Sequence, residues 1–339
     1  MPNTSVIILN WNEPELTVEC VKSVLNQTYE DFEIILIDNA SEDDSFEIFG
    51  RELRDEKINQ IRCHENIGYA GGNNTGVLMA NGEYVVILNN DTIVEKDWLE
   101  HLVNAIESDE KIGSVSSFEI REGKDLQGKT ISLVGYPSLY TKSGELVDIF
   151  AINGVSFIYR KELAIPPFDP EYFIYAEDTY LGWLLKLKGY DNKLSFNSIV
   201  RHYHNTTRRK NRKTDEYFTY LGERNRIMNY LIFYELKNVI RIMPLMVMSI
   251  LFGNLSEPSK IYCRLKSYTW IIFNLGRIAG KRRNIQKQRI MKDSDLISQM
   301  SCRFRDKELS GSKKAILDAI NGIFSIYCSL VGLKTIEKC

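Results

Sequence analysis

The chain has 339 residues, enough for one large α/β domain with an appendage or for two modest domains. Its 44% hydrophobic and 26% charged residues are an ordinary globular composition, and the six cysteines show no CxxC or zinc-finger spacing, which argues against a disulfide framework. Residues 1–180 contain 13 Lys and Arg against 33 Asp and Glu, whereas residues 181–339 contain 30 against 12. The acidic half should repel nucleic acid and attract cations. The basic half should favour an anionic surface such as phospholipid headgroups or a polyphosphate, unless the two halves simply attract each other.

Strand and helix patterns alternate through the first 110 residues. Continuous apolar runs predict strands buried on both faces of a parallel sheet. The predicted strands are Ser5–Leu9, Phe32–Ile37, Ile61–His64 and Tyr84–Leu88, and the predicted helices are Glu15–Gln27, Asp43–Arg54 and Asp97–Ser108. This alternation indicates a doubly wound, mostly parallel sheet.

Polar clusters follow three of these strands. They are Asn10–Asn12, Asp38–Asn39 and Asn89–Asp91. In an open parallel sheet the ligand lies beyond the carboxyl ends of the strands, so we expect these clusters to form one site.

Beyond residue 110 the pattern loosens. It predicts mixed strands and loops over 113–162, a helix over Glu177–Gly189 and a strand over Ser198–His204. From about residue 205 the sequence becomes helical and basic, with tracts at Arg208–Lys213 and Lys281–Arg289. We therefore expect a catalytic unit over 1–235 and a helical extension over 236–339.

The order of the motifs carries a resemblance to a known family. The motifs are Asn10–Asn12, Asp38–Ser41, Glu65–Asn74, Asn89–Asp91, Asn153-Gly154, Glu177-Asp178 and His202. Together they resemble family 2 glycosyltransferases, in particular the rhamnosyltransferase-like branch, over about residues 4–235. The resemblance implies a GT-A nucleotide-diphospho-sugar transferase fold, with a nucleotide-binding half near 1–110 and an acceptor half near 111–235. It also implies an inverting, hexosyltransferase-type enzyme that moves a sugar from a UDP- or dTDP-sugar to a glycan or lipid-linked acceptor.

A nucleotide diphosphate leaving group carries concentrated negative charge, which a divalent cation can stabilise. Asp91 offers the oxygen ligand that Mg²⁺ or Mn²⁺ prefers, and the resemblance assigns it the metal. Family members commonly carry another carboxylate where this chain has Asn89 and Asn90, so a further ligand is expected. His202 would supply it, or His204, which faces the same side of the strand. The alternative for His202 is a strand-end histidine without a ligand role.

The resemblance also implies which residues surround the donor. Asp38 would hydrogen-bond the base beside Trp11 and Asn12, unless it is only a turn-forming Asp. The glycine-rich segment lacks the G-x-G-x-x-G spacing, and its glycines would let the backbone approach the nucleotide sugar. The expected nucleotide-sugar-binding residues are Asn10, Trp11, Asn12, Asp38, Asn66, Gly68, Gly71, Asn73, Asn90 and Asp91.

By the same resemblance, Asp178 is the base that takes the acceptor proton in a single in-line displacement, and Glu177 orients the acceptor or supports the site. Local geometry alone would also suit a helix N-cap Asp with an acidic first turn. Asn153 and Gly154 would line the acceptor side. Trp183 would stack on a sugar there or, alternatively, pack in the core.

Three further positions qualify the resemblance. Arg224, beside Asn225, resembles another family mark and would meet phosphate or form a structural ion pair. At Tyr180 and Leu184 this chain departs from the family's Asp and Arg, so acceptor contacts made there in relatives cannot be carried over.

The carboxyl-terminal region is expected either to bind a membrane or to pack on the catalytic unit. Val239–Phe252 is shorter than the about 20 apolar residues of a spanning helix. Ala315–Leu333 is longer, but its polar stripe of Asn321, Ser325 and Ser329 favours an amphipathic helix in the interface. With no signal peptide recognised, the basic tracts predict a cytoplasmic protein, peripheral on the inner face of the cell membrane.

Two rival functions stand beside the transferase. Asn89-Asn90 would also fit a non-catalytic sugar-nucleotide binding subunit that has lost metal affinity. A nucleotidyltransferase is disfavoured, because the first strand is followed by Asn10–Pro14 and not by a glycine-rich, Lys- or Arg-bearing triphosphate loop.

Overall fold

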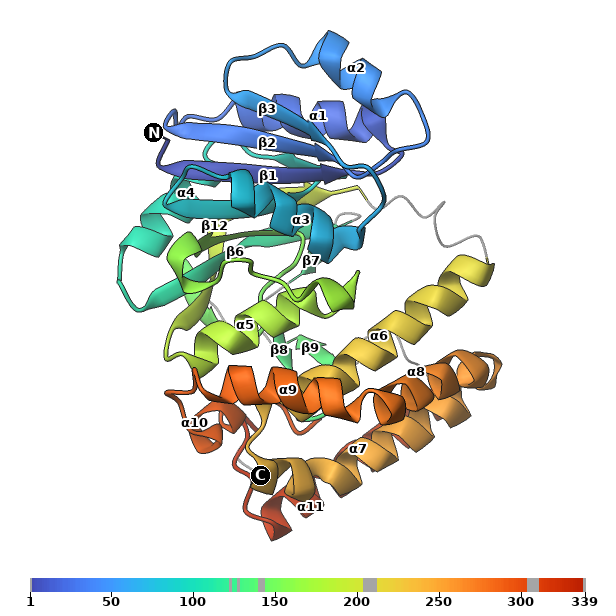
Figure 1. Ribbon diagram of the computed structural model, residues 1–339. Helices are drawn as coiled ribbons and strands as arrows, with labels where there is room; N and C mark the ends of the chain where they lie inside the picture. The colour runs from blue at the N-terminus through green and yellow to red at the C-terminus, as the bar shows by residue number, and fades with distance from the viewer. Residues whose placement is uncertain are drawn as a thin grey trace.

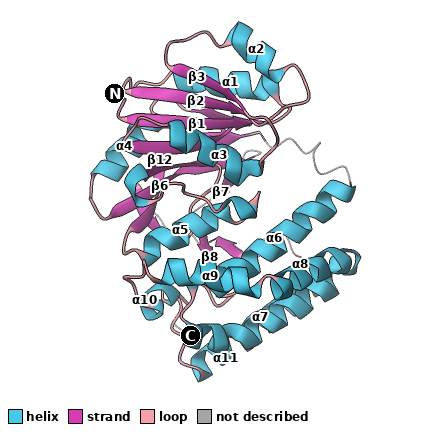
Figure 2. Cartoon of the chain, viewed as in Figure 1, coloured by secondary structure: helices cyan, strands magenta, loops and turns pink. Residues whose placement is uncertain are grey.

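A ten-stranded mixed sheet forms the upper half of the molecule, and the carboxyl-terminal helices gather below it (Figure 1). The computed structural model describes residues 2–121, 124–126, 129–139, 144–203, 212–303 and 311–337. The predicted tract Arg208–Lys213 lies largely outside the described residues, and His204 lies wholly outside them. Figure 2 shows the strands as one twisted layer with helices on both sides.

The sheet has the order β10-β12-β6-β11-β4-β1-β2-β3, with β5 paired to β12 and β7 to β6. The strands are β1 Thr4–Asn10, β2 Phe32–Asp38, β3 Ile58–Arg62, β4 Tyr84–Asn89, β5 Thr92–Val94, β6 Ile112–Arg121, β7 Lys124–Leu126, β10 Leu146–Ile149, β11 Ser156–Arg160 and β12 Asp191–His202. A small separate sheet pairs β8 Lys129–Ile131 with β9 Pro137–Leu139.

The first four strands are parallel, as predicted. In the second half β11 runs antiparallel to β4 and β6, whereas β12 and β6 are parallel. The α/β fold with a mostly parallel sheet and a helical extension is therefore confirmed, with antiparallel pairing at β5, β7, β10 and β11.

Alternate residues of β1 show why the sheet is covered on both faces. Val6 and Ile8 are fully buried in a core shared with α1, α2 and α4, whereas Ile7 is fully buried in a second core shared with α3 and α5. The helices are α1 Pro14–Leu25, α2 Ser45–Glu52, α3 Gly68–Met79, α4 Trp98–Glu107 and α5 Glu177–Leu187. Burial on both faces produces the unbroken apolar run that the sequence displays.

Two predicted boundaries move in the structure. The strand expected at Ile61–His64 is β3, which ends at Arg62 and begins three residues earlier than predicted. It is an edge strand of partly exposed residues, so its apolar signal is weak. The strand expected at Ser198–His204 belongs to β12, which starts at Asp191, where an irregular register hides the alternation.

The glycine-rich segment forms helix α3 and packs closely on β1. A Cβ added to Gly72 would lie 2.4 Å from Leu9 Cδ1, and one added to Gly76 would lie 2.5 Å from Ile7 Cγ2. Both glycines therefore allow the helix axis to approach the strand. This role differs from the expected approach of backbone to a ligand.

The described residues of the carboxyl-terminal region form six α-helices, of which α8 and α9 pack against α6. They are α6 Arg212–Phe233, α7 Leu236–Ser256, α8 Ile261–Phe273, α9 Leu275–Gln286, α10 Asp293–Ile297 and α11 Gly311–Leu330. One hydrophobic core runs from Ile7 in the sheet to Phe324 in α11. The extension is therefore packed against the α/β unit through a common interior.

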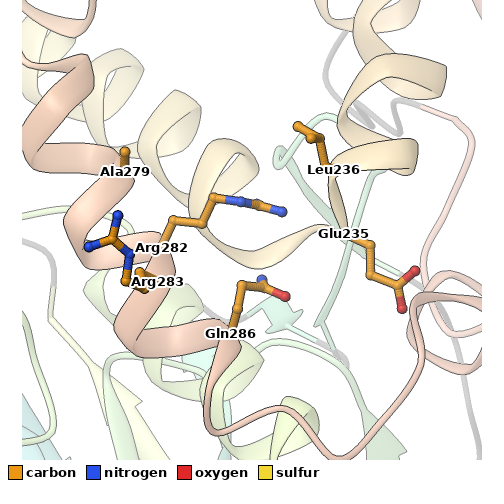
Figure 3. A pocket seen from close by; sticks show the side chains of 6 residues that line it. All are labelled: Glu235, Leu236, Ala279, Arg282, Arg283 and Gln286. Atoms are coloured by element: carbon orange, nitrogen blue, oxygen red, sulfur yellow. The ribbon is translucent and has the colours of Figure 1, made fainter.

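The joint between α6 and α7 is a surface groove (Figure 3) lined by six residues, namely Glu235, Leu236, Ala279, Arg282, Arg283 and Gln286. Two of them satisfy the end of α6. Gln286 donates to the carbonyls of Ile232 and Phe233, each at 2.8 Å, and Arg282 donates to Tyr234 O at 2.5 Å. Since carbonyls at a helix end lack partners within the helix, these side chains act as its cap.

The length of α7 corrects an expectation. The sequence predicts an apolar run of only 14 residues over Val239–Phe252, but the helix spans 21 residues and has a mean hydropathy of 1.7 over its most apolar part. By length and composition it could cross a membrane, alone among the helices searched in the described residues.

The close contact of α3 with β1 can be tested by substitution. Gly76→Ala should lower the free energy of unfolding by about 1–3 kcal/mol, because the added methyl group overlaps Ile7. Gly50→Ala, in α2 where nothing lies within 4 Å of the added Cβ, should instead raise it by about 0.5–1 kcal/mol. Denaturant unfolding measures both, and equal effects would refute the packing role of Gly76.

Candidate active site

The ends of β1 and β2 are joined by buried polar side chains. Asn10 is fully buried, accepts a hydrogen bond from Thr17 Oγ1 at 2.8 Å and donates to Asp38 Oδ1 at 3.2 Å and Ser41 Oγ at 3.0 Å. Asp38 is also fully buried, and its Oδ2 lies 3.4 Å from Arg62 Nε. These residues form the floor of the site, beneath the surface on which a base would lie.

The loop after β1 is fixed against the loop after β2. Asn12 has a left-handed φ of 57°, and its Oδ1 accepts from the backbone N–H of Glu42 at 2.7 Å. Trp11 is 36% exposed beside it. The two loops therefore hold an accessible indole at the edge of the site, as an aromatic face for a base requires.

The start of α3 is held by its own neighbours. Asn66 Oδ1 accepts from the N–H of Gly68 at 2.9 Å and from Asn39 Nδ2 at 3.0 Å. Gly68 has a φ of +75°, and a Cβ there would lie 2.5 Å from a ring carbon of Phe173. A Cβ at Gly71 would lie 3.0 Å from Ile67 Cβ. These contacts account for the glycines without a ligand.

Two buried amides complete this part of the site. Asn90 is 9% exposed and donates to Thr17 Oγ1 at 2.9 Å. Asn73 donates to Tyr69 O at 2.9 Å, and its own Oδ1 is buried without a hydrogen-bond partner. A buried acceptor without a hydrogen bond is costly. Asn73 Oδ1 is therefore free to accept a hydrogen bond from a bound nucleotide sugar.

Tyr69 joins the two halves of the sheet edge. Its hydroxyl lies 3.1 Å from Asn89 Oδ1 and 2.9 Å from the carbonyl oxygen of Gly154. Asn89 ends β4 in the nucleotide half, and Gly154 precedes β11 in the acceptor half. One side chain therefore sets the spacing between the two sides of the site.

The same tyrosine reports where the carboxylates gather. Burial raises the pKa of Tyr69 well above its usual value, and the charges of Glu177, Asp178 and Asp91 raise it further. The contacts of Tyr69 agree with this, because Asn89 lies two residues before Asp91 and Gly154 lies against Asp178 Oδ2.

His202 links Asp91 to a carboxylate that the sequence analysis missed. His202 Nε2 lies 3.2 Å from Asp91 Oδ1, and Nδ1 lies 2.7 Å from Glu119 Oε1. Glu119 is fully buried, and it also binds Arg121 Nη2 at 2.6 Å and Asn153 Nδ2 at 3.0 Å. The only sequence signal was an acidic residue inside the apolar strand β6.

Burial lowers the pKa of His202, but hydrogen bonds to Asp91 and Glu119 and their charges outweigh it and raise the pKa to about 9, so the imidazole is protonated at neutral pH. A divalent cation bound at Nε2 would displace that proton. A metal-binding histidine usually presents its other ring nitrogen to a carboxylate, as Nδ1 does here to Glu119. The 3.2 Å between Asp91 Oδ1 and His202 Nε2 is close to the separation of two adjacent ligands that each lie about 2.1 Å from the same ion. Among the described residues no cluster of three or more His, Cys, Asp or Glu could hold a metal alone.

Glu177 and Asp178 begin α5. The helix is preceded by Ala176 in a left-handed conformation, so Asp178 is not its N-cap. Thr179 N–H donates to Asp178 Oδ1 at 2.6 Å, and a Cβ at Gly154 would lie 3.0 Å from Asp178 Oδ2. Thr179 thus holds Oδ1 of the carboxylate, and Oδ2 lies beside Gly154.

Glu177 is placed differently from its neighbour. It is 6% exposed, and its Oε2 has no hydrogen-bond partner. Burial, together with the charge of Asp178, raises the pKa of Glu177 to about 8. At neutral pH it is therefore mostly a neutral acid, whereas Asp178 occupies a half-exposed position.

The segment before α5 is held in an unusual backbone conformation. Phe173, Tyr175 and Ala176 all have φ between 62° and 73°. Asn225 is fully buried, and its Nδ2 donates to the carbonyls of Tyr172, Ile174 and Tyr175 at 2.9, 3.0 and 2.8 Å. Left-handed non-glycine residues persist only where the surroundings fix them. Asn225 is therefore the side chain that sets the path of the chain into Glu177 and Asp178.

Arg224 supports the same segment. It donates to the carbonyls of Glu171 and Tyr172, and its guanidinium lies 4.9 Å from the ring centroid of Trp270. Among the described residues its partners are backbone carbonyls, the side chain of Asn225 and an aromatic ring, in place of the expected ion pair; the phosphate contact stays a prediction.

Trp183 is a correction to the sequence analysis. It is 1% exposed, stacks on Phe233 at 5.1 Å and meets Phe150 and Tyr234 edge-on at 5.5 and 4.9 Å. Because its ring is enclosed by other aromatic side chains, it has no face for a sugar. The alternative of core packing is the one that the structure shows.

A cavity of about 380 Å³ adjoins Asp178. Its lining includes Asp178 of α5, Gly222 of α6, and Glu257, Lys260 and Arg264 at the turn between α7 and α8. The volume is that of a small-molecule site. The carboxyl-terminal helices thus take part in the space in front of Asp178.

Comparison with known proteins agrees with the resemblance carried by the motifs. Residues 5–165 match the profile of Glycosyl transferase family 2. Glycosyltransferase GlyG of Streptococcus pneumoniae serotype 4 is 32% identical over 123 residues, 35% of this chain and 41% of that protein. Poly-beta-1,6-N-acetyl-D-glucosamine synthase of Staphylococcus aureus is 29% identical over 185 residues, 53% of this chain and 45% of that protein. The chain therefore spans less than half the length of either relative.

A solved structure supports the fold. The mannosyltransferase PcManGT from Pyrobaculum calidifontis, in complex with GDP-Man and Mn²⁺, matches with a TM-score of 0.52 at 16% identity over 85% of this chain and 84% of that one. The GT-A fold predicted from the motifs is confirmed.

The buried acid gives a pH-dependent stability. Glu177 ionises near pH 4.5 when unfolded and near pH 8 when folded, so the unfolded state binds fewer protons across that window and stability falls as pH rises through it. Glu177→Gln should remove this pH dependence, which lowers the free energy of unfolding of the wild type by roughly a few kcal/mol by about pH 8. Thermal unfolding between about pH 5 and 8 measures it, with exposed Glu162→Gln as the control. Parallel profiles for wild type and Glu177→Gln would refute the assignment.

The role of Asn225 predicts a local loss of order. Asn225→Ala removes the two N–H groups that are shared among the carbonyls of Tyr172, Ile174 and Tyr175, which should cost about 2 kcal/mol or more. Amide hydrogen exchange should accelerate at residues 173–177 before it does in the sheet. Asn284→Ala, an exposed substitution on α9, should change neither quantity. Unchanged exchange at 173–177 in Asn225→Ala would show that other contacts hold the segment.

Proposed function

We propose that this chain, whose residues 5–165 match the profile of Glycosyl transferase family 2, is a transferase of that family that moves a hexose from a UDP- or dTDP-sugar to a glycan or lipid-linked acceptor with inversion. The observation that carries the proposal is the contact of Tyr69 with both Asn89, two residues before Asp91, and Gly154, against which Asp178 lies. A metal residue and a proton acceptor that border the same site are what a single displacement needs. The relatives that match suggest a role in polysaccharide or cell-envelope synthesis.

The donor would lie across the ends of β1, β2 and β4. Trp11 offers an exposed aromatic face to the base, and Asp38 and Asn10 lie beneath it. Asn73 carries a buried oxygen without a partner, which a donor hydroxyl or amide could satisfy. The expected contacts of Asn66 and Asn90 with the donor belong to this part of the proposal.

Asp91 and His202 would hold a divalent cation, Mn²⁺ or Mg²⁺, with the remaining ligands from the donor diphosphate and water. Such an ion stabilises the charge of the departing diphosphate. Glu119 keeps His202 oriented, so that Nε2 and not Nδ1 faces Asp91. The neighbouring PcManGT structure contains Mn²⁺, which favours this use of the site.

Asp178 would take the proton from the acceptor hydroxyl. Thr179 holds one carboxylate oxygen, and the other faces Gly154 beside the cavity in which an acceptor could lie. Glu177, neutral near pH 7, would support Asp178 without adding a second charge at the reacting carbon. Asn153 would line the acceptor side through its bond to Glu119.

The location follows from charge and composition. We propose a cytoplasmic protein, peripheral on the inner face of the cell membrane, because the basic residues are concentrated in the carboxyl-terminal helices.

The cation site predicts a graded series of variants. Asp91→Ala should abolish Mn²⁺-dependent donor binding, and His202→Ala should weaken it. Glu119→Gln, which removes the carboxylate that His202 Nδ1 shares with Arg121 and Asn153, should weaken it by about 10–100-fold. Calorimetric titration with UDP- and dTDP-sugars, with and without Mn²⁺, measures the series. Glu95→Gln, which removes a surface partner of Arg201, is the control, and full metal-dependent binding by Asp91→Ala would overturn the assignment.

Asp178→Asn tests catalysis. It should retain donor binding and lose transfer by about a hundredfold to ten-thousandfold, because general-base catalysis typically contributes 10²–10⁴. Exposed Asp97→Asn should keep full activity. Equal nucleoside diphosphate release by wild type and Asp178→Asn, with and without metal, would favour a non-catalytic binding subunit. Release of pyrophosphate would indicate a nucleotidyltransferase.

A further inference from the structure

Helix α7 exposes a continuous apolar stripe. Its large apolar side chains that are 49–79% exposed are Leu236, Ile240, Met243, Val247, Leu251 and Leu255. At 3.6 residues per turn this spacing of three or four residues places them on one side of the helix. The stripe extends from the first residue of α7 to within one residue of its end.

Helix α8 repeats the pattern. Its exposed apolar side chains are Ile261, Tyr262, Leu265, Ile272 and Phe273, and Phe273 reaches 87% exposure. The opposite side of α8, with Cys263 and Ser267, is buried, and Ser267 Oγ donates to Tyr220 O of α6 at 2.8 Å. We call these two stripes the outer face. Soluble monomers rarely expose an apolar surface of this extent without a partner.

The charge of α7, α8 and the turn between them is mostly basic. Residues 236–273 contain five Lys and Arg, namely Lys237, Arg241, Lys260, Arg264 and Lys266, and one acidic residue, Glu257. Lys237 at the start of α7 is 69% exposed, and Lys266 of α8 is exposed with its Nζ 4.5 Å from the Tyr262 ring. Apolar stripes with basic neighbours are complementary to the interface of an anionic bilayer, where lysines meet headgroups.

The inner side of α7 is committed to protein. Asn238 is 2% exposed and donates to Asp293 Oδ2 at 2.9 Å. Tyr327 of α11 donates to Arg241 O at 2.7 Å, and Arg241 donates to Val331 O and to Asn238 Oδ1. A helix held this way on one side can present its other side to lipid but cannot enter the bilayer alone. This geometry favours a helix lying along the surface over one that spans it.

Helix α11 also exposes apolar side chains. Its polar stripe of Asn321, Ser325 and Ser329 is turned partly toward the protein, since Ser325 Oγ lies 3.5 Å from Cys302 Sγ. The exposed apolar residues of α11 are Ile316, Ile323, Ile326 and Leu330.

We propose that the outer face binds an anionic membrane surface, with α7 and α8 lying flat in the headgroup region. The turn between these helices carries Glu257, Lys260 and Arg264, which also line the cavity beside Asp178. Binding through the outer face therefore sets that cavity next to the bilayer. Together with the proposed function, on which this last step rests, the geometry selects an acceptor presented from the membrane, a lipid-linked saccharide.

The test is flotation of the purified full chain with preformed vesicles of phosphatidylglycerol and phosphatidylcholine, or of phosphatidylcholine alone. Wild type should float with the anionic vesicles and detach at high salt. Combining Ile240→Ser, Val247→Ser and Leu251→Ser should lower the partition coefficient at least tenfold. Combining Lys237→Gln and Lys266→Gln should lower it roughly tenfold on anionic vesicles only.

The matched control is Leu78→Ser with Met79→Ser, which are 65% and 50% exposed on α3 and should leave binding unchanged. Failure of wild type to float with anionic vesicles, or equal flotation of the α7 variant, would overturn the proposal. A dimer in light scattering that the α7 variant dissociates, without vesicle binding, would assign the outer face to a second copy. Resistance of the expressed chain to alkaline carbonate extraction would overturn the flat orientation.

Activity in solution separates this proposal from the proposed function. Metal-dependent nucleotide release from the donor should be the same in wild type and the α7 variant without vesicles. Loss of flotation with release intact supports the outer face as a separate membrane-binding element. Absence of release in both proteins would count against the proposed function while leaving the flotation result to decide the outer face.

Discussion

The site depends on one buried carboxylate. Glu119 is fully buried in β6, and burying a charge is costly unless it is paired. Its partners are Arg121, His202 and Asn153, so the requirement for pairing fixes the imidazole that faces Asp91 and the amide on the acceptor side. In the parallel pairing of β6 with β12, Glu119 is opposite Val200, so Glu119 and His202 are two residues apart in register and point to the same face of the sheet. The geometry of the proposed cation site thus follows from the neutralisation of a core charge.

A second constraint places the proposed base. Three non-glycine residues before α5 adopt left-handed φ angles, which cost energy and need external support. Asn225 of α6 gives that support by binding three successive segments of backbone, and Arg224 holds the carbonyls just before them. Helix α6 is also the helix around which α7, α8 and α9 pack. The carboxyl-terminal region is therefore connected to Asp178 by direct hydrogen bonds and by the cavity that both line.

Much of this arrangement could be predicted from the sequence. Strands buried on both faces leave unbroken apolar runs, so β1, β2 and β4 and their polar ends were found, and the order of the motifs indicated the GT-A fold. Glu119 was missed because its importance lies in contacts across 83 residues with His202, which no local pattern shows. The helix at 68–79 and the orientation of Trp183 were also beyond local patterns, since glycine packing and aromatic enclosure depend on the neighbouring elements.

The central claim is that Asp91 and Asp178 act on opposite sides of one reacting carbon, with no enzyme nucleophile between them. The most direct measurement is the anomeric configuration of the first-formed product, determined by proton NMR on a donor of known configuration with Mn²⁺ present. The account predicts inversion relative to the donor in the initial product. Retention of configuration would contradict it, because a single displacement assisted by Asp178 cannot leave the anomeric centre unchanged.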